Sequence, residues 1–311
     1  MKFLLTIAAC ALVLCLRAQG LSYAVSATEA LAPATSEVSD ARPAALRRVN
    51  GMLLAEGRVD GAAGYFIVDT GSPGLVLNRV PEHSSGELTG ATGRAAYAKT
   101  QATTLELAGL TQTHVPALAV DMRYTEAQLG VAVLGLIGYQ QLRAAPVTIA
   151  LSQNQLRFAS PAQEPGSDAT TFGFDLLGHL PVLEAQLGDE QLTLAFDSGS
   201  SVNLIDADQL PRLRQALRGR PATRRLAGVD SHPVEVPCAL VSLTFVDETD
   251  FRDRPFLFVD LTAIRAALPS LNGLLSPAFW QRSDFVLDYS ARTLSLLAPL
   301  SGKEQAAPTQ R

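Results

Sequence analysis

The chain has 311 residues, of which 47% are hydrophobic and 18% are charged, with a formal net charge of −5. This length and this apolar content are enough to bury a substantial core and indicate two domains. The negative charge balance argues against nucleic acid as a partner. The composition therefore favours a folded two-domain protein.

The N-terminal residues 1–27 have the pattern of a signal peptide. Lys2 supplies a positive charge, an apolar run follows from Phe3 to Leu16, and small residues near Ala24 offer a cleavage site. The segment predicts a secreted or periplasmic protein without a stable membrane span after cleavage. A membrane anchor is the less favoured alternative, because the run is shorter than the ~20 residues that span a bilayer.

Removal of the signal peptide would take away Cys10 and Cys15 and leave Cys238, so no intrachain disulfide is expected. Cys238 lies in an apolar run over 234–241, which favours a packed thiol over a nucleophile. The histidines lack the spacing of metal ligands, and we expect neither a metal nor a cofactor. These histidines are His83, His114, His179 and His232.

Composition shifts divide the rest of the chain. A stretch rich in Ala, Pro, Ser, Thr and Glu predicts a flexible leader, and clusters of Pro, Gly and Ser predict a linker between two lobes. The leader ends in Arg47-Arg48, for which an exposed pair is favoured over a processing site. The expected parts are the leader (28–48), an N-terminal lobe (49–160), a linker (161–171), a C-terminal lobe (172–300) and a disordered tail (301–311).

The sequence of the two lobes predicts short strands separated by turns. Asp60-Gly61 and Gly188-Asp189 are turn signals of the kind that hairpins require. These patterns predict a mainly β protein. The expected strands cover 52–59, 65–69, 102–107, 115–120, 147–151, 155–158, 192–197, 234–246, 256–260, 285–287 and 293–296.

Two of these strands end in the same motif, in which an apolar run precedes an acid, a hydroxyl residue, a glycine and a serine. An Asp needed only for solubility would lie among polar residues, whereas these two follow runs typical of buried strands and precede a glycine that permits a sharp turn. The pair indicates two carboxylates meeting in one site. The copies are Phe66-Ile67-Val68-Asp69-Thr70-Gly71-Ser72 and Leu194-Ala195-Phe196-Asp197-Ser198-Gly199-Ser200.

The sequence around the motifs is duplicated. Segments 53–56 and 75–78 match segments 128 positions later, and 135–138 and 147–149 match segments 138 positions later. The second half therefore carries a ten-residue insertion between Asp206 and Gly228. Within it, residues 208–218 predict a short helix with an apolar face. That face is formed by Leu210, Leu213 and Leu217.

A duplicated β chain with paired Asp-Thr/Ser-Gly-Ser motifs resembles the aspartic proteases of the pepsin and retropepsin type, and in particular bacterial secreted proteins with two retropepsin-like halves in one chain. The resemblance covers about residues 50–298. It includes an apolar-apolar-Gly element, Leu136-Ile137-Gly138, which in the family packs beside the catalytic loop. It implies a bilobal acid protease fold with two homologous β-barrel-like lobes related by a pseudo-twofold axis.

The resemblance implies an aspartic endopeptidase with Asp69 and Asp197 as catalytic residues, acting on a peptide or an unfolded protein. Two carboxylates within hydrogen-bonding reach cannot both ionise easily, and the aspartic-protease dyad is the standard example of such a pair. One acid would take a proton from a water molecule while the other donates a proton to the scissile carbonyl.

Other motif residues are expected to support the active-site loops. Thr70 and Ser198 match the family positions whose hydroxyls lock the two loops together. Gly71 and Gly199 permit the turns and offer backbone N–H donors to the carboxylates.

Two further groups are expected near the dyad. Ser72 and Ser200 would hydrogen-bond the outer carboxylate oxygens or, alternatively, stabilise the turns. Glycine-rich hairpins would close over a substrate as flaps, and Gly90, Gly93 and Gly228 are the candidates for their tips. The same glycines also fit ordinary turns.

The sequence departs from the family pattern at three positions. Ser276 replaces the glycine that corresponds to Gly138, Pro73 follows the first motif, and Asp206 replaces the repeat partner of Asn78. None of these changes removes a catalytic group, so we expect local adjustment around them.

Two alternatives remain open. The chain could be a non-catalytic peptide-binding protein that retains the protease fold, or its halves could exchange between two chains to form a dimer. A monomeric endopeptidase is the preferred interpretation.

Overall fold

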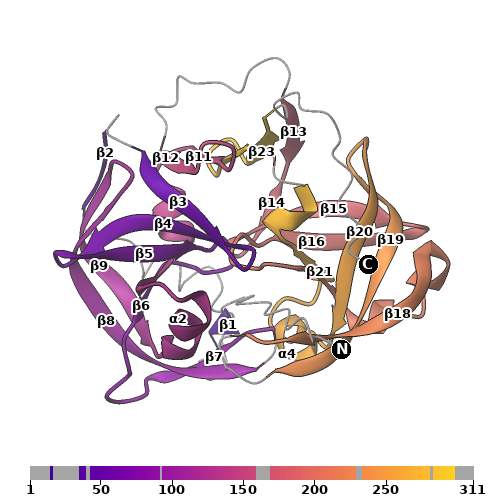
Figure 1. Cartoon of the computed structure of the whole chain (residues 1–311), viewed down its shortest axis with the longest axis horizontal. Helices are drawn as coiled ribbons and strands as arrows, with labels where there is room; N and C mark the ends of the chain where they lie inside the picture. The colour runs from indigo at the N-terminus through magenta and orange to yellow at the C-terminus, as the bar shows by residue number, and fades with distance from the viewer. Residues whose placement is uncertain are drawn as a thin grey trace.

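The fold is described from a computed structural model that covers residues 15–16, 35–39, 43–91, 93–158, 169–228, 233–280 and 283–297. Over these ranges the protein is mainly β, and its strands gather into two lobes with short helices at their margins (Figure 1). Apart from 15–16, the signal peptide expected at 1–27 lies outside the described residues, as does the tail expected at 301–311.

The first half of the sequence contains most of the strands of one lobe. Its strands are β1 (Cys15–Leu16), β2 (Thr35–Val38), β3 (Ala44–Val49), β4 (Met52–Val59), β5 (Ala62–Val68), β6 (Leu75–Asn78), β7 (Gly86–Thr89), β8 (Arg94–Leu107), β9 (Leu110–Val120), β10 (Val133–Ile137), β11 (Val147–Ala150) and β12 (Gln155–Phe158). Its helices are α2 (Arg123–Leu129) and α3 (Tyr139–Leu142).

The second half repeats this plan. Its strands are β13 (Thr170–Gly173), β14 (Asp175–Leu177), β15 (Leu180–Leu187), β16 (Glu190–Phe196), β17 (Asn203–Asp206), β18 (Leu217–Leu226), β19 (Val234–Val246), β20 (Thr249–Val259), β21 (Gly273–Leu275), β22 (Phe285–Asp288) and β23 (Thr293–Leu296). Its helices are α4 (Thr262–Arg265) and the 3-10 turns η1 (Ala207–Gln209), η2 (Leu213–Ala216) and η3 (Pro277–Trp280). The strands expected at 52–59, 155–158, 234–246 and 293–296 begin and end as predicted.

The strands form two sheets, and the larger one joins the lobes. Its order is β1-β7-β8-β9-β6-β10-β5-β4-β3-β12-β11-β22-β23-β13, with β2 paired to β9. The smaller sheet has the order β14-β15-β16-β21-β17-β20-β19-β18. Because β22, β23 and β13 come from the second half of the sequence, the larger sheet contains strands of both halves.

The lobes meet where β11 pairs antiparallel with β22, its own repeat copy. Thr148 lies opposite Val286, and Val147 lies opposite Leu287. Val286 is also the residue that the offset of 138 positions assigns to Thr148. A local two-fold axis therefore passes through this pair, with β12 and β3 on one side and β23 and β13 on the other.

The strands that carry the two Asp motifs have the same neighbours in both lobes. β5 pairs in parallel with β10, which pairs antiparallel with β6, and β16, β21 and β17 repeat this arrangement. Phe66 and Val68 pack into one apolar cluster, whereas Ile67 between them packs into another on the opposite face. Because both faces of β5 are covered, the strand is a continuous apolar run, as the sequence indicated.

Three apolar clusters form the core. One extends across both lobes, and each lobe has a further cluster beneath its hairpin and helix. Removing a large side chain such as Phe196 or Trp280 from water contributes on the order of 2 kcal/mol. In the described part of the chain, no helix is both long and apolar enough to cross a bilayer.

The prediction that residues 28–48 form a flexible leader is wrong for the part of this segment that the structure describes. β2 pairs with β9, and β3 pairs with both β4 and β12. The partners in β9 and β12 lie 72 to 112 positions away in the sequence, so local composition could not indicate those pairings. The pairing of β3 with β4 is local, because only Asn50-Gly51 separates the two strands. The C-terminal lobe likewise begins at β13, inside the linker expected at 161–171, of which 161–168 lie outside the described residues.

The helix expected at 208–218 is also wrong. Two 3-10 turns, η1 and η2, lead into β18, which forms a hairpin with β19. Pro211 lacks the N–H that an α-helix needs and its ring would clash with the preceding turn. The apolar spacing nevertheless reflects packing against the core, because Leu213 is buried and both Leu210 and Leu217 pack partly against the core.

Candidate active site

Asp69 and Asp197 lie at the ends of two equivalent strands, directly after β5 and β16, and both are 0% exposed. The N–H of Asp69 donates to the carbonyl of Ile137 at 3.0 Å, and the N–H of Asp197 donates to that of Leu275 at 2.8 Å. The last residues of β10 and β21 therefore fix the position of the acid that follows β5 and of the acid that follows β16.

The turns after the acids bring the two motifs into direct contact. Gly71 and Gly199 each donate a backbone N–H to Oδ1 of the acid two positions earlier, at 2.9 Å in both copies. A Cβ on Gly199 would lie 2.3 Å from Cγ of Asp69, and one on Gly71 would lie 3.0 Å from Oδ1 of Asp197. Glycine is required here because each turn passes so close to the opposite carboxyl.

Thr70 and Ser198 lock the two turns together through four hydrogen bonds. The hydroxyl of Thr70 donates to the carbonyl of Phe196 at 2.7 Å and accepts from the N–H of Ser198 at 2.9 Å. The hydroxyl of Ser198 donates to the carbonyl of Val68 at 2.8 Å and accepts from the N–H of Thr70 at 3.0 Å. The two residues are 128 positions apart and make the same contacts, so each hydroxyl joins its own turn to the opposite one.

The hydroxyls of Ser72 and Ser200 do not hydrogen-bond the carboxylates. The hydroxyl of Ser72 donates to the carbonyl of Gly74 at 2.9 Å, and that of Ser200 donates to the carbonyl of Val202 at 2.7 Å. The alternative expected for these residues, stabilisation of the turn, is the one observed.

Each acid consequently has one oxygen without a protein partner. Within the described residues, Oδ2 of Asp69 and Oδ2 of Asp197 are buried and accept no hydrogen bond. The two carboxyls are also within hydrogen-bonding reach of each other. The site thus combines one fixed oxygen per acid with one that can interact with another group.

Burial raises the pKa of both acids. Burial and the nearby charge of Asp197 raise the pKa of Asp69 well above its ordinary value of 3.8. Burial also raises the pKa of Asp197, to about 6, against hydrogen bonds that lower it. Because two adjacent carboxylates repel each other, the pair favours a state that holds one proton.

Ser276 is accommodated by a second substitution in the same lobe. In the first lobe, a Cβ on Gly138 would lie 2.3 Å from the carbonyl oxygen of Ser72. In the second lobe, Oδ1 of Asn203 accepts hydrogen bonds from the N–H and the hydroxyl of Ser276, at 2.9 and 3.0 Å. Asn203 stands where the first half has Leu75, so an apolar contact is replaced by a buried polar pair.

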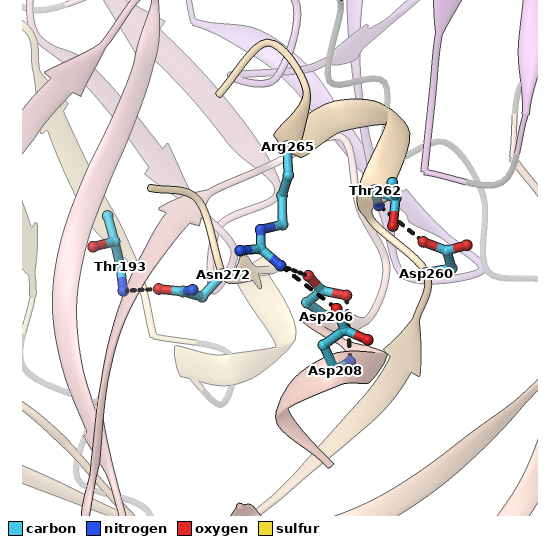
Figure 2. A network of polar contacts seen from close by, with 7 residues as sticks. All are labelled: Thr193, Asp206, Asp208, Asp260, Thr262, Arg265 and Asn272. Carbon is cyan, nitrogen blue, oxygen red and sulfur yellow. Dashed lines mark hydrogen bonds and ion pairs between the residues drawn. The ribbon is translucent and has the colours of Figure 1, made fainter. Parts of the chain in front are cut away.

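Asp206, the other departure near the site, forms an ion pair with Arg265 in α4. Figure 2 shows the guanidinium pointing toward Asp206 and Asp208, and the second contact measures 3.9 Å. The corresponding Asn78 in the first lobe donates to Glu126 of α2 at 2.7 Å. In both lobes a polar contact fastens the helix to the strand that follows the motif, with different charges.

Described residues beside the tips of both hairpins are buried. In the β7–β8 hairpin the N–H of Gly90 donates to the carbonyl of Gly93 at 2.7 Å, and Ala91 packs into the apolar cluster of the C-terminal lobe. Leu226, at the end of β18, belongs to the same cluster, and Gly228 is buried beside it. The first hairpin therefore reaches across to the opposite lobe. Part of the second tip, residues 229–232, lies outside the described residues.

His179 is a site residue that the sequence did not reveal. Its side chain is 5% exposed, and its Nε2 lies 2.8 Å from the carbonyl oxygen of Gly71. Its repeat partner, 128 positions earlier, is Gly51. This difference between the aligned halves was the sequence signal that could have drawn attention to His179.

The other candidate residues lie away from the dyad. Cys238 is half-buried beside the apolar cluster of the C-terminal lobe and burial raises the pKa of its thiol, as a packed cysteine predicts. His83 and His114 are exposed, and His232 lies outside the described residues. A hollow of about 750 Å³ on the N-terminal lobe, lined by Glu56, Tyr65 and neighbouring residues, includes neither acid.

Comparison with known proteins does not place the chain in a family. No protein-family model matches it, and no curated protein matches it in sequence. In the described segments, no group of three or more His, Cys, Asp or Glu is arranged to hold a metal ion. The chemistry of the site is therefore argued from its geometry.

Proposed function

We propose that this chain is an aspartic endopeptidase with a pepsin/retropepsin-like fold, which hydrolyses peptide bonds through the dyad of Asp69 and Asp197. The observation that carries the proposal is the meeting of two buried carboxyls from two copies of one motif. Each has one oxygen held by a glycine N–H and another without a protein partner. This arrangement suits a pair that shares one proton, which is the state that acid-base hydrolysis requires.

In the proposed reaction the ionised acid accepts a proton from a water molecule, and the oxygen of that water attacks the scissile carbonyl carbon. The protonated acid donates its proton to the carbonyl oxygen, which gives a neutral tetrahedral intermediate. The C–N bond then breaks as the leaving nitrogen takes a proton from one acid and a hydroxyl of the intermediate gives its proton to the other acid, which leaves a carboxylic acid product. The enzyme forms no covalent bond to the substrate, and the dyad returns to its singly protonated state.

The hairpins β7–β8 and β18–β19 are proposed as flaps over the substrate. Their tips share an apolar cluster, so entry of a peptide requires Ala91 and Leu226 to separate. The substrate is a peptide or an unfolded protein, because an extended chain is what could lie between two lobes. Export by the N-terminal segment and a monomeric state complete the proposal.

The proposal is tested with the chain lacking residues 1–27, incubated with an unfolded protein between pH 4 and 9, with and without pepstatin. We expect Asp69→Asn and Asp197→Asn each to lower kcat by at least ~1000-fold, because either change removes the acid-base pair. Asp189→Asn, in an exposed turn, is the matched control and should cut like the wild type. Full peptide hydrolysis by Asp69→Asn would contradict the proposal.

A non-catalytic peptide-binding protein is the second candidate. It is favoured by one observation, the complete burial of both acids in a structure in which Ala91 and Leu226, beside the two hairpin tips, belong to one apolar cluster. In that case a peptide would bind equally to the wild type and to Asp197→Asn and would be recovered intact from both.

A further inference from the structure

We propose that His179 is a positioning residue that holds the Asp69 turn from the opposite lobe and thereby makes two otherwise equivalent carboxyls unequal. This inference rests on the proposed function for its catalytic consequence, but its structural part can be tested separately. It starts from a contact of the first motif that the duplication does not repeat at the second.

His179 lies in the turn between β14 and β15, in the C-terminal lobe, and reaches Gly71 in the N-terminal lobe. A carbonyl oxygen only accepts hydrogen bonds, so Nε2 of His179 must carry the proton. Burial also lowers the pKa of His179 to about 4, which keeps the imidazole neutral at physiological pH. The histidine is therefore fixed as the Nε2–H tautomer.

Gly71 is the residue whose movement would disturb the dyad most directly. Its N–H donates to Oδ1 of Asp69, and its Cα passes close to Oδ1 of Asp197. Because His179 binds the carbonyl of the same residue, the imidazole restrains the orientation of the turn that presents the N–H. Loss of this restraint would loosen the donor on Asp69 without removing any group of the dyad.

The other lobe has no such restraint. Gly51 occupies the repeat position of His179, at a φ of +89°, and a Cβ there would lie 2.7 Å from Cβ of Ser201. Ser201 directly follows the second motif, so the backbone of Gly51 lies against that turn. At the equivalent position of the first turn lies the imidazole of His179. The two acids thus differ in their support although their own motifs are nearly identical.

The activity test compares three variants of the chain lacking residues 1–27. His179→Met removes the donor at similar length, and we expect kcat to fall about 100-fold with KM within about twofold, since small displacements of catalytic groups have effects of this size. His179→Gln keeps an N–H donor at the same reach and should recover kcat to within about fivefold of the wild type. His83→Met, at an exposed position, is the control.

Two results would overturn the inference. One is a folded His179→Met variant with kcat near the wild-type value, and the other is an equal loss in His179→Met and His179→Gln, which would indicate a packing role. A purely structural histidine would lower the free energy of unfolding while leaving kcat of the folded protein unchanged.

The structural part is tested by NMR and does not require activity. The ¹⁵N shifts of the His179 ring in the wild type should show the Nε2–H tautomer, and the Gly71 amide should exchange with solvent at least ~10-fold faster in His179→Gly or His179→Met. An Nδ1–H tautomer in the wild type would overturn the inference even if the variants failed to fold or the chain cut no peptide, and so would unchanged exchange at Gly71 in either folded variant. Failure of the endopeptidase assay with these NMR results intact would contradict the proposed function alone.

Discussion

At the scale of single residues, Asp197 and His179 are buried titratable groups whose pKa values move in opposite directions. Burial raises the pKa of Asp197 from 3.8 to about 6 and lowers that of His179 from 6.5 to about 4. Between these values unfolding releases a proton from Asp197 and takes one up at His179. The two groups therefore oppose each other in the pH dependence of stability.

We predict that Asp197→Asn makes the folded state more stable at neutral pH. The cost of burying Asp197 is absent below pH 3.8, grows as the unfolded state ionises, and is complete above about pH 6. At about 1.36 kcal/mol per pH unit, the variant should exceed the wild type by up to about 3 kcal/mol at pH 7.

Urea unfolding at pH 3.5, 5 and 7 measures this difference, with Asp189→Asn as the exposed control. Because only the wild type carries the cost of burying Asp197, the advantage of Asp197→Asn over the wild type should grow from pH 3.5 to pH 7. A difference that does not change with pH would contradict the prediction.

The lock between the motifs gives a second prediction. Thr70→Val keeps the shape of the side chain but leaves the carbonyl of Phe196 and the N–H of Ser198 without their partner. Two unpaired buried groups should lower the free energy of unfolding by about 2–4 kcal/mol, whereas Thr70→Ser should lose far less. Denaturant unfolding measures both, and a Thr70→Val variant as stable as the wild type would show that the lock contributes nothing.

At the scale of elements, each lobe fastens a helix to the strand that follows its motif, by Asn78 and Glu126 in one lobe and Asp206 and Arg265 in the other. Only 2% of the Asp206 side chain is exposed, so its charge depends on Arg265 for compensation (Figure 2). The helix and strand of the C-terminal lobe are thus joined by a partly buried ion pair.

We predict that Arg265→Leu destabilises the protein by about 3–5 kcal/mol, because it leaves the buried Asp206 carboxylate uncompensated. The double variant Asp206→Asn/Arg265→Leu should recover part of this loss. Arg123→Leu, which breaks the exposed pair of Arg123 and Asp121, is the control and should have little effect. A double variant no more stable than Arg265→Leu would mean that the buried charge is not the cause.

The strands and the paired acids could be predicted because their signals are local. The apolar run before Asp69 and the turn at Gly71 are visible in seven consecutive residues, and the duplication confirms them at Asp197. β2 was missed because its partner β9 is distant in the sequence, whereas β3 was missed although the Asn50-Gly51 turn into β4 is local. The helix predicted at 208–218 was wrong because the prediction gave its apolar spacing more weight than Pro211. The contact of His179 with Gly71 could not be inferred, since nothing local relates residues 108 positions apart.

At the scale of the whole molecule, the dyad sets the pH range in which the proposed enzyme works. One acid must be ionised and the other protonated, so activity should fall below about pH 6, where both hold protons, and again above the higher apparent pKa of the pair. We therefore predict a bell-shaped profile of kcat/KM with an optimum above pH 6.

Measurement of kcat/KM from pH 3 to 9 checks this profile, with the folded state followed by circular dichroism at each pH. A maximum near pH 3 in the folded protein would contradict it, because burial would then not have raised the pKa values as described. The buried, neutral His179 should keep its hydrogen bond to Gly71 throughout the predicted range.

The pairing of β11 with β22 has a consequence for the origin of the chain. Since Thr148 lies opposite its own repeat copy, the same register would let two identical half-length chains join by this strand, each contributing one acid and one locking hydroxyl. In such a pair the two turns would be identical, and the same residue would support both of them. The difference between Gly51 and His179 could not arise. Covalent fusion of the halves thus allowed the two sides of one site to diverge independently, which a symmetric ancestor of two identical subunits could not do.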